Sequence, residues 1–334
     1  MKKFFGTDGI RGKTGDYPVT PDFFVKLGYA AGLVLTKNIK GNKKPSVVIG
    51  KDTRISGYML ESSLEAGFSS AGVDVYLTGP IPTPAIAFLT QSLIADIGIM
   101  ITASHNPYED NGIKLFSGNG TKLSDEVENE IEEMIENEIK CVEPSKLGKA
   151  RRLDNARAQY IKFCLKTIPK ELNLKNYKIV LDCAHGATYQ VAPEIFQTLG
   201  ADIVLINHEP DGLNINFKAG STHPEFLIDN VKNHNADLGI AFDGDGDRVI
   251  MVSDQGELVD GDQILYLIMD YYHNQNKLEG GVVGTLMTNL ALEEKCKSLN
   301  VPFERTDVGD RYVSEMLRKK SWQIGGENSG HIVL

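Results

Sequence analysis

The sequence predicts an α/β protein with three similar α/β domains, each a mixed, mostly parallel sheet flanked by helices. The order strand, helix, strand occurs three times, which is typical of βαβ units. In addition, the apolar run ADIGI at 95–99 recurs as ADLGI at 236–240, and both runs lead directly into polar loops. Similar segments in similar places indicate a repeated structural unit, with a cleft between the repeats.

Each unit reads as an apolar strand, a helix and a second strand. The expected segments, in that order, are 47–49, 56–71 and 73–77, then 179–181, 189–199 and 203–206, then 282–283, 289–299 and 301–303.

Two further helices and the domain limits complete the prediction. Thr20 as an N-cap before Pro21 opens one helix. The stretch 124–140 gathers apolar residues on one face and acids on the other, which predicts a second helix. Its apolar face consists of Val127, Ile131, Met134, Ile135 and Ile139. The expected domains are 1–155, 156–255 and 256–334.

The composition excludes several classes of function. The 334 residues are 41% hydrophobic and 24% charged, with a net charge of −10, so neither nucleic acid nor an anionic membrane is expected as a partner. No apolar run approaches the ~20 residues that span a bilayer. The start of the chain lacks the apolar stretch of a signal peptide. None of the four cysteines forms a CxxC pair, which favours a reducing, cytoplasmic location.

Three polar loops follow strands, one in each expected domain. They are TASHNP at 102–107, DGDGDR at 243–248 and GENSGH at 326–331. Ligands of open α/β sheets bind at the carboxyl ends of the strands. We therefore expect the three loops to share one cleft.

The acidic loop predicts a metal site. Asp243, Asp245 and Asp247 alternate with glycine, and such a cluster repels itself unless a cation lies among the carboxylates. Oxygen ligands favour Mg²⁺, Mn²⁺ or Ca²⁺. Arg248 and Asp254 stand where an EF-hand needs Gly and Glu, which argues against that motif. Two alternatives stay open, a surface turn and an Asp-x-Asp site with Asp243 as covalent nucleophile.

The serine loop is ambiguous by itself. Ser104 is a candidate nucleophile, but it needs activation, and Ser and Asn are also common loop formers. No GxSxG elbow supports a Ser–His hydrolase. A phosphate on Ser104 would need cations nearby. Basic residues in loops of the same domain offer them, namely Arg11, Lys51, Arg54 and Lys114.

Together these motifs resemble the α-D-phosphohexomutase family over almost the whole chain. The matching motifs are FGTDGIRG at 5–12, KDTR at 51–54, TASHNP at 102–107, NGIK at 111–114, and the loops 243–248 and 326–331. The first block and the NSGH form of the last loop are most similar to the bacterial branch that acts on glucosamine phosphates, within amino-sugar and peptidoglycan precursor metabolism.

The resemblance implies a mechanism and a set of site residues. Ser104 would be phosphorylated and, with Asp243, Asp245 and Asp247, would hold one Mg²⁺ per chain. The phosphoryl group would pass to glucosamine 6-phosphate, and a bound glucosamine 1,6-bisphosphate would return its other phosphate to the serine to give glucosamine 1-phosphate. The resemblance implies Glu327, Ser329 and His331 as sugar-binding residues. Candidates for charge stabilisation or proton transfer are Arg11, Lys114, Arg248 and His331.

The chain also departs from the family pattern. The fourth domain of the family, with its phosphate-gripping loop, has no counterpart after Leu334, so we expect Mg²⁺ binding but weak turnover. Phosphomannomutase or phosphoglucomutase activity, an Asp243-dependent phosphatase and a non-catalytic sugar-phosphate-binding protein are the alternatives. The expected partner is a hexosamine phosphate, and a homodimer is left open.

Overall fold

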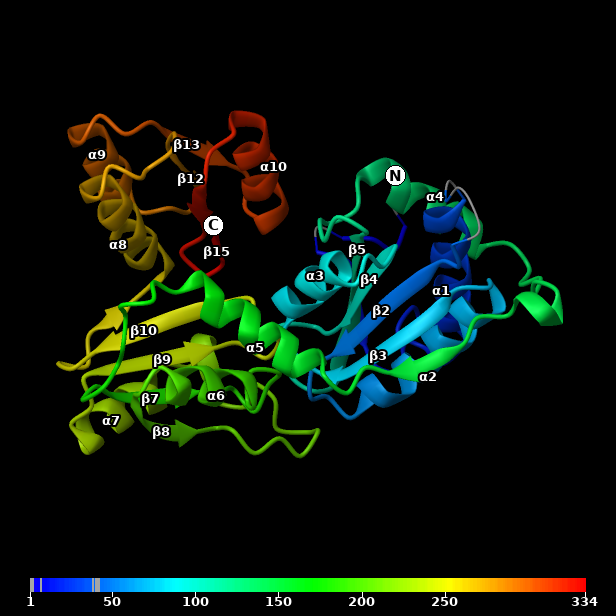
Figure 1. Ribbon diagram of the computed structural model, residues 1–334, viewed down its shortest axis with the longest axis horizontal. Helices are drawn as coiled ribbons and strands as arrows, with labels where there is room; N and C mark the ends of the chain where they lie inside the picture. Colours follow the sequence, from blue (N-terminus) through cyan, green and yellow to red (C-terminus); the bar gives the residue numbers. More distant parts are fainter. Residues whose placement is uncertain (1–2, 7, 38, 40–42) are drawn as a thin grey trace.

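The computed structural model describes residues 3–6, 8–37, 39 and 43–334 and contains three separate β-sheets in chain order (Figure 1). The sheets have six, five and four strands within these residues. This arrangement confirms the expected series of three α/β units.

The first sheet has the strand order β1-β5-β4-β2-β3-β6. The central strands β2, β3 and β4 are parallel, whereas β5 runs antiparallel to β4 and β1. Its strands are β1 (Ile10–Lys13), β2 (Ser46–Lys51), β3 (Asp74–Pro80), β4 (Ile97–Ile101), β5 (Asp110–Ser117) and β6 (Ala150–Arg152). Its helices are α1 (Pro21–Thr36), α2 (Ser56–Ser70), α3 (Thr83–Ser92) and α4 (Asp125–Ile135), followed by the short helix η1 (Pro144–Lys146).

Helices cover both faces of this sheet, and the central strand β2 is buried on both sides. Val47 and Ile49 belong to the core beneath α1, α2 and α4. Val48 points the other way, into the core formed with α3 and α5 (Ala156–Thr167). This alternation explains why the strand reads as a continuous apolar run.

The second sheet has the order β11-β10-β9-β7-β8 and the third the order β13-β12-β14-β15. The remaining strands are β7 (Lys178–Asp182), β8 (Asp202–Ile206), β9 (Leu238–Phe242), β10 (Val249–Ser253), β11 (Leu258–Val259), β12 (Val282–Thr285), β13 (Phe303–Thr306), β14 (Ile324–Gly326) and β15 (Ile332–Val333). The remaining helices are α6 (Val191–Thr198), η2 (Gly220–Thr222), α7 (Glu225–His234), α8 (Gly261–Asn274), α9 (Leu290–Ser298) and α10 (Asp310–Lys320). The exact domain limits stay a prediction.

Two expected elements differ from the structure. The helix expected over 124–140 ends at Ile135, because acids crowd its carboxyl end and no basic residue occupies its last turn, so the helix dipole is opposed there. The strand expected at 301–303 begins at Phe303 instead. Pro302 cannot donate a hydrogen bond to the sheet, although its carbonyl accepts one from Val282 N.

None of the helices formed by the described residues is both long and apolar enough to cross a membrane.

Candidate active site

The three polar loops meet at the carboxyl ends of β4, β9 and β14. The Ser104 hydroxyl donates a hydrogen bond to Asp243 Oδ2 at 2.6 Å, which joins the first loop to the second. His331 Nδ1 lies 3.9 Å from Asp247 Oδ2, which joins the third loop to the second. The sheets therefore bring together side chains that are far apart in the sequence.

The aspartate cluster has the donor set of a hard-cation site. One carboxylate oxygen from each of Asp243, Asp245 and Asp247 lies within 4.8 Å of the others. In the described part of the chain, Asp245 Oδ1 and Asp247 Oδ1 are buried and have no hydrogen-bond partner. Buried carboxylate oxygens without partners are costly, and a divalent cation would satisfy them. The residues present therefore fit Mg²⁺.

The other oxygens of this cluster are held in place by neighbours from the first sheet. Thr83 Oγ1 donates to Asp245 Oδ2 at 2.5 Å. Lys114 Nζ donates to Asp245 Oδ2 at 2.8 Å and to Asp247 Oδ2 at 2.7 Å. These contacts orient the carboxylates of Asp245 and Asp247 and leave one oxygen of each without a partner among the described residues.

The pKa values of two carboxylates in the cluster are shifted in opposite directions. Burial, together with the charges of Asp247 and Asp245, raises the pKa of Asp243 well above its usual range. Burial also acts to raise the pKa of Asp247, but Lys114 and His331 outweigh it and hold that pKa well below the usual range. A bound cation would favour the ionised form of all three carboxylates.

Asp8 is a site residue that the sequence did not single out. Its carboxylate pairs with Arg11 and Lys122 and lies 3.3 Å from Lys114 Nζ. Burial opposes ionisation, but the charges of these three cations hold the pKa of Asp8 below its usual range. Lys122 Nζ also donates to Asp310 on α10 at 2.6 Å, so this network reaches the third domain. Asp8 lies within the block 5–12, but no local pattern marked its partners.

Ser104 has an unusual backbone. Its φ of 52° is in the left-handed region, which costs free energy for a residue with a side chain. Its amide donates to Thr102 Oγ1 at 2.8 Å, and the residue is 1% exposed. The hydroxyl is 3.5 Å from His105 Nδ1, at the outer limit of a hydrogen bond, so Asp243 is the closer partner. This geometry does not support a Ser–His hydrolase.

Lys51 and Arg54 do not surround the Ser104 hydroxyl as expected. Lys51 Nζ donates to the buried Glu61 at 2.5 Å. Arg54 pairs with Asp52 and donates to backbone carbonyls of the serine loop. The physical reason is that buried charges require close partners, which these two cations find within the first domain.

The remaining predicted residues lie around the same loops. The Arg248 amide donates to Asp243 Oδ1 at 3.1 Å, which leaves its half-buried side chain outside that contact. Glu327 is buried and accepts a hydrogen bond from Gly309 N at 2.9 Å, and Ser329 follows it, half-buried, in the third loop. His331 Nε2 is 3.4 Å from Asp310 Oδ2.

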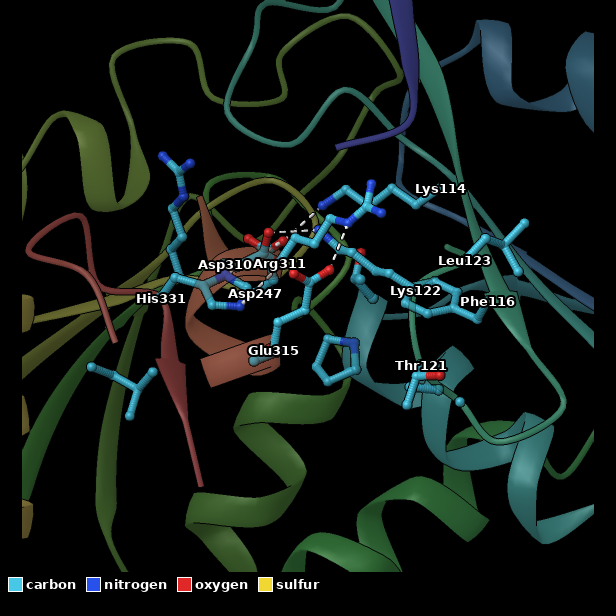
Figure 2. A pocket seen from close by; sticks show the side chains of 18 of the residues that line it. Lys114, Phe116, Thr121, Lys122, Leu123, Asp247, Asp310, Arg311, Glu315 and His331 are labelled. Atoms are coloured by element: carbon cyan, nitrogen blue, oxygen red, sulfur yellow. Dashed lines mark hydrogen bonds and ion pairs between the residues drawn. The ribbon is translucent and has the colours of Figure 1, made fainter. Parts of the chain in front are cut away.

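A cavity of about 490 Å³ lies beside the aspartate cluster (Figure 2). Lys114, Lys122 and Asp247 line it, and Asp310 and His331 close it from the third domain. Neither Ser104 nor Asp243 lines this cavity. The cavity therefore adjoins the site at the junction of the three domains and does not enclose the serine.

Similarity to known proteins identifies the class of protein to which this chain belongs and then its family. Models of α/β/α domains I, II and III of phosphoglucomutase/phosphomannomutase match residues 2–141, 158–256 and 260–334, so fold and site define a phosphohexomutase. Phosphoglucosamine mutase of Aeromonas hydrophila is 58% identical over 99% of this chain and 74% of the relative, and that of Methylobacillus flagellatus is 56% identical with the same coverage. The chain belongs to the phosphoglucosamine mutase family, isomerases that interconvert glucosamine 6-phosphate and glucosamine 1-phosphate.

Solved structures agree with this assignment. A phosphoglucomutase/phosphomannomutase family protein from Burkholderia thailandensis has a TM-score of 0.84 at 26% identity, over 99% of this chain and 72% of that one. An Aspergillus fumigatus N-acetylphosphoglucosamine mutase, in complex with GlcNAc-6P and magnesium, has a TM-score of 0.61 at 18% identity, over 99% and 67%. At that identity the second likeness supports the fold alone.

Proposed function

We propose that Ser104 carries the transferable phosphoryl group and that Asp243, Asp245 and Asp247 hold one Mg²⁺ beside it. The observation that carries the proposal is the 2.6 Å hydrogen bond from the Ser104 hydroxyl to Asp243, within a cluster that has two unpartnered oxygens. A phosphate on Ser104 would add close to two negative charges at this point. A cation held by the three carboxylates and a phosphate oxygen would balance them.

The proposed reaction conserves phosphate. The phosphoryl group leaves Ser104 Oγ for the free 1-hydroxyl of glucosamine 6-phosphate, which loses its proton, and glucosamine 1,6-bisphosphate forms. The bisphosphate then changes its orientation in the site so that its 6-phosphate faces Ser104. The 6-phosphoryl group returns to Ser104 Oγ, and the sugar 6-oxygen regains a proton to give glucosamine 1-phosphate. Such transfers depend mainly on positioning and charge neutralisation. When bound, Mg²⁺ would neutralise charge on the phosphoryl oxygens.

The protein's own cations have separate tasks in this scheme. Lys114 is buried among three carboxylates and supplies a fixed positive charge beside the cluster. Arg11 and Arg248 are half-buried, their charges act on His105 of the serine loop, and they are the proposed contacts to phosphate oxygens. His331, between Asp247 and Asp310, is the candidate for moving the hydroxyl proton.

The third loop is proposed to recognise the sugar. Gly309 N holds one carboxylate oxygen of Glu327, which leaves the other to accept a sugar hydroxyl. Ser329 and His331 offer further polar groups from the same loop. A cytoplasmic setting is consistent with the free cysteines, and the acidic net charge argues against nucleic acid as a partner.

Phosphate mapping tests the proposal. The protein is incubated with Mg²⁺ and glucose 1,6-bisphosphate, and intact mass and peptide mapping locate any bound phosphate. We expect one phosphate on Ser104, its loss in Ser104→Ala, and its retention in Ser62→Ala. Ser62 is a matched control on α2 whose exposed hydroxyl donates to Tyr58 O. A hydroxylamine-sensitive phosphate on Asp243 would instead establish the aspartyl nucleophile. That outcome is disfavoured because Ser104 and Arg248 N already engage both oxygens of Asp243.

A further inference from the structure

Asn216 reaches from the second domain into the backbone of the serine loop. Its Nδ2 donates to the carbonyl oxygen of Ser104 at 2.8 Å and to that of Asn106 at 2.9 Å. The residue is 6% exposed. Its backbone N–H donates to Ala184 O at 2.9 Å, which anchors it in the second domain. Asn216 therefore holds two carbonyls of another domain without touching the Ser104 hydroxyl.

Arg54 approaches the same two carbonyls from the first domain. Its Nη2 donates to Ser104 O at 3.2 Å and to Asn106 O at 2.6 Å. The guanidinium is fully buried and fixed by its pair with Asp52. Each carbonyl thus has one donor from each domain. A left-handed residue such as Ser104 persists only where its surroundings determine its backbone, and these four hydrogen bonds do so.

The aspartate loop packs against the same point. A Cβ at Gly244 would lie 2.6 Å from Asn216 Nδ2 and 2.7 Å from Ser104 O. Gly244 separates Asp243 from Asp245. The side-chain amide of Asn216 therefore lies where the serine loop and the aspartate loop touch. A shift of this amide would change the distance between Ser104 Oγ and Asp243.

We infer that Asn216 is a positioning residue for phosphoryl transfer, and this inference rests on the proposed role of Ser104. Its amide holds the left-handed backbone of Ser104 so that Oγ stays in line with the phosphoryl donor and beside Asp243. Its effect is expected on the rate of transfer at saturation, because its side chain donates to backbone carbonyls of the serine loop. Displacements of about 1 Å in such a site can reduce rates on the order of 100-fold.

Two variants remove the donor in different ways. Asn216→Gly suits the φ of 59° at this position and deletes the amide. Asn216→Asp keeps the shape but places acceptors against two carbonyls. The matched control is Asn214→Gly in the same loop, whose side chain donates to Glu209 O and accepts from Asp211 N. The maximal rate of Ser104 phosphorylation, the half-saturating concentration of glucose 1,6-bisphosphate and the Kd for Mg²⁺ are measured for each.

We expect Asn216→Gly to lower the maximal rate on the order of 100-fold, with half-saturation and Mg²⁺ affinity changed less than about twofold. Asn216→Asp is expected to lose at least as much, and Asn214→Gly to match the parent. Circular dichroism checks that each variant is folded. A folded Asn216→Gly or Asn216→Asp protein that transfers at the parental rate would overturn the inference, as would a loss confined to half-saturation. Absence of phosphate from Ser104 in the parent would overturn the proposed function and, with it, this inference.

Discussion

The first domain meets the second and the third domains through different chemistry. Toward the second, the contacts are buried and short, from Thr83 to Asp245 and from Ser104 to Asp243. Toward the third, they are ion pairs between longer and more exposed side chains, such as Lys122 with Asp310 and Arg311 on α10 with Asp125. Buried hydrogen bonds fix a geometry, whereas partly exposed ion pairs are weak and screened by salt. We therefore expect the proposed phosphoryl site to be the more rigid junction and the proposed sugar-recognition side to be the more adjustable one.

The largest expected effect comes from removing a negative charge at the contact between the first two domains. Asp243→Asn keeps the shape of the side chain but removes a negative charge and one of two acceptor oxygens from the cluster. We expect Mg²⁺ binding by calorimetry to weaken strongly and phosphorylation of Ser104 to slow about 10³-fold. Asp254→Asn, at an exposed acid outside the cluster, is the control. Unchanged Mg²⁺ affinity in Asp243→Asn would place the cation elsewhere.

An intermediate effect is expected at Thr83. Thr83→Val removes the 2.5 Å hydrogen bond to Asp245 Oδ2 but keeps the backbone bond from Thr83 N to Asp245 O. Loss of a donor to a buried carboxylate is expected to cost about 1–3 kcal/mol of unfolding free energy. Urea denaturation in 0 and about 0.5 M NaCl measures it, and the cost should persist in salt because the contact is buried. Thr198→Val, on an exposed helix face, should cost much less.

The smallest effect is expected at the third domain. Lys122→Gln removes the ion pairs to Asp8 and Asp310, whose side chains are about one-sixth to one-quarter exposed. The expected loss is about 0.5–1 kcal/mol, largely absent at ~1 M salt. Amide hydrogen exchange in α10 should become faster, while exchange around β9 stays unchanged. Equal acceleration in both regions would show that the two junctions do not differ as described. Lys297→Gln, whose side chain lies on α9 away from this network, is the control.

Local patterns predicted the three sheets and the aspartate cluster because their determinants are close in sequence. Glycine between successive aspartates is enough to bring carboxylates together, and βαβ order is enough to place loops at one edge. The partners of Ser104 and Asp245 could not be predicted from the residues alone, since Ser104 and Asp243 are 139 positions apart and Thr83 and Asp245 are 162 apart. Asn216 escaped notice for the same reason, as no motif links it to the serine loop.

The placement of α5 has a consequence for how the chain unfolds. Ala156 and Tyr160 on this helix share an apolar core with Ile86 on α3 and Val191 on α6. The helix lies between the first and the second sheets (Figure 1). Separating these two units would expose that cluster to water on both sides. We therefore expect the first two domains to unfold as one cooperative unit, so that the elements that bear the serine and the aspartates are lost or retained together.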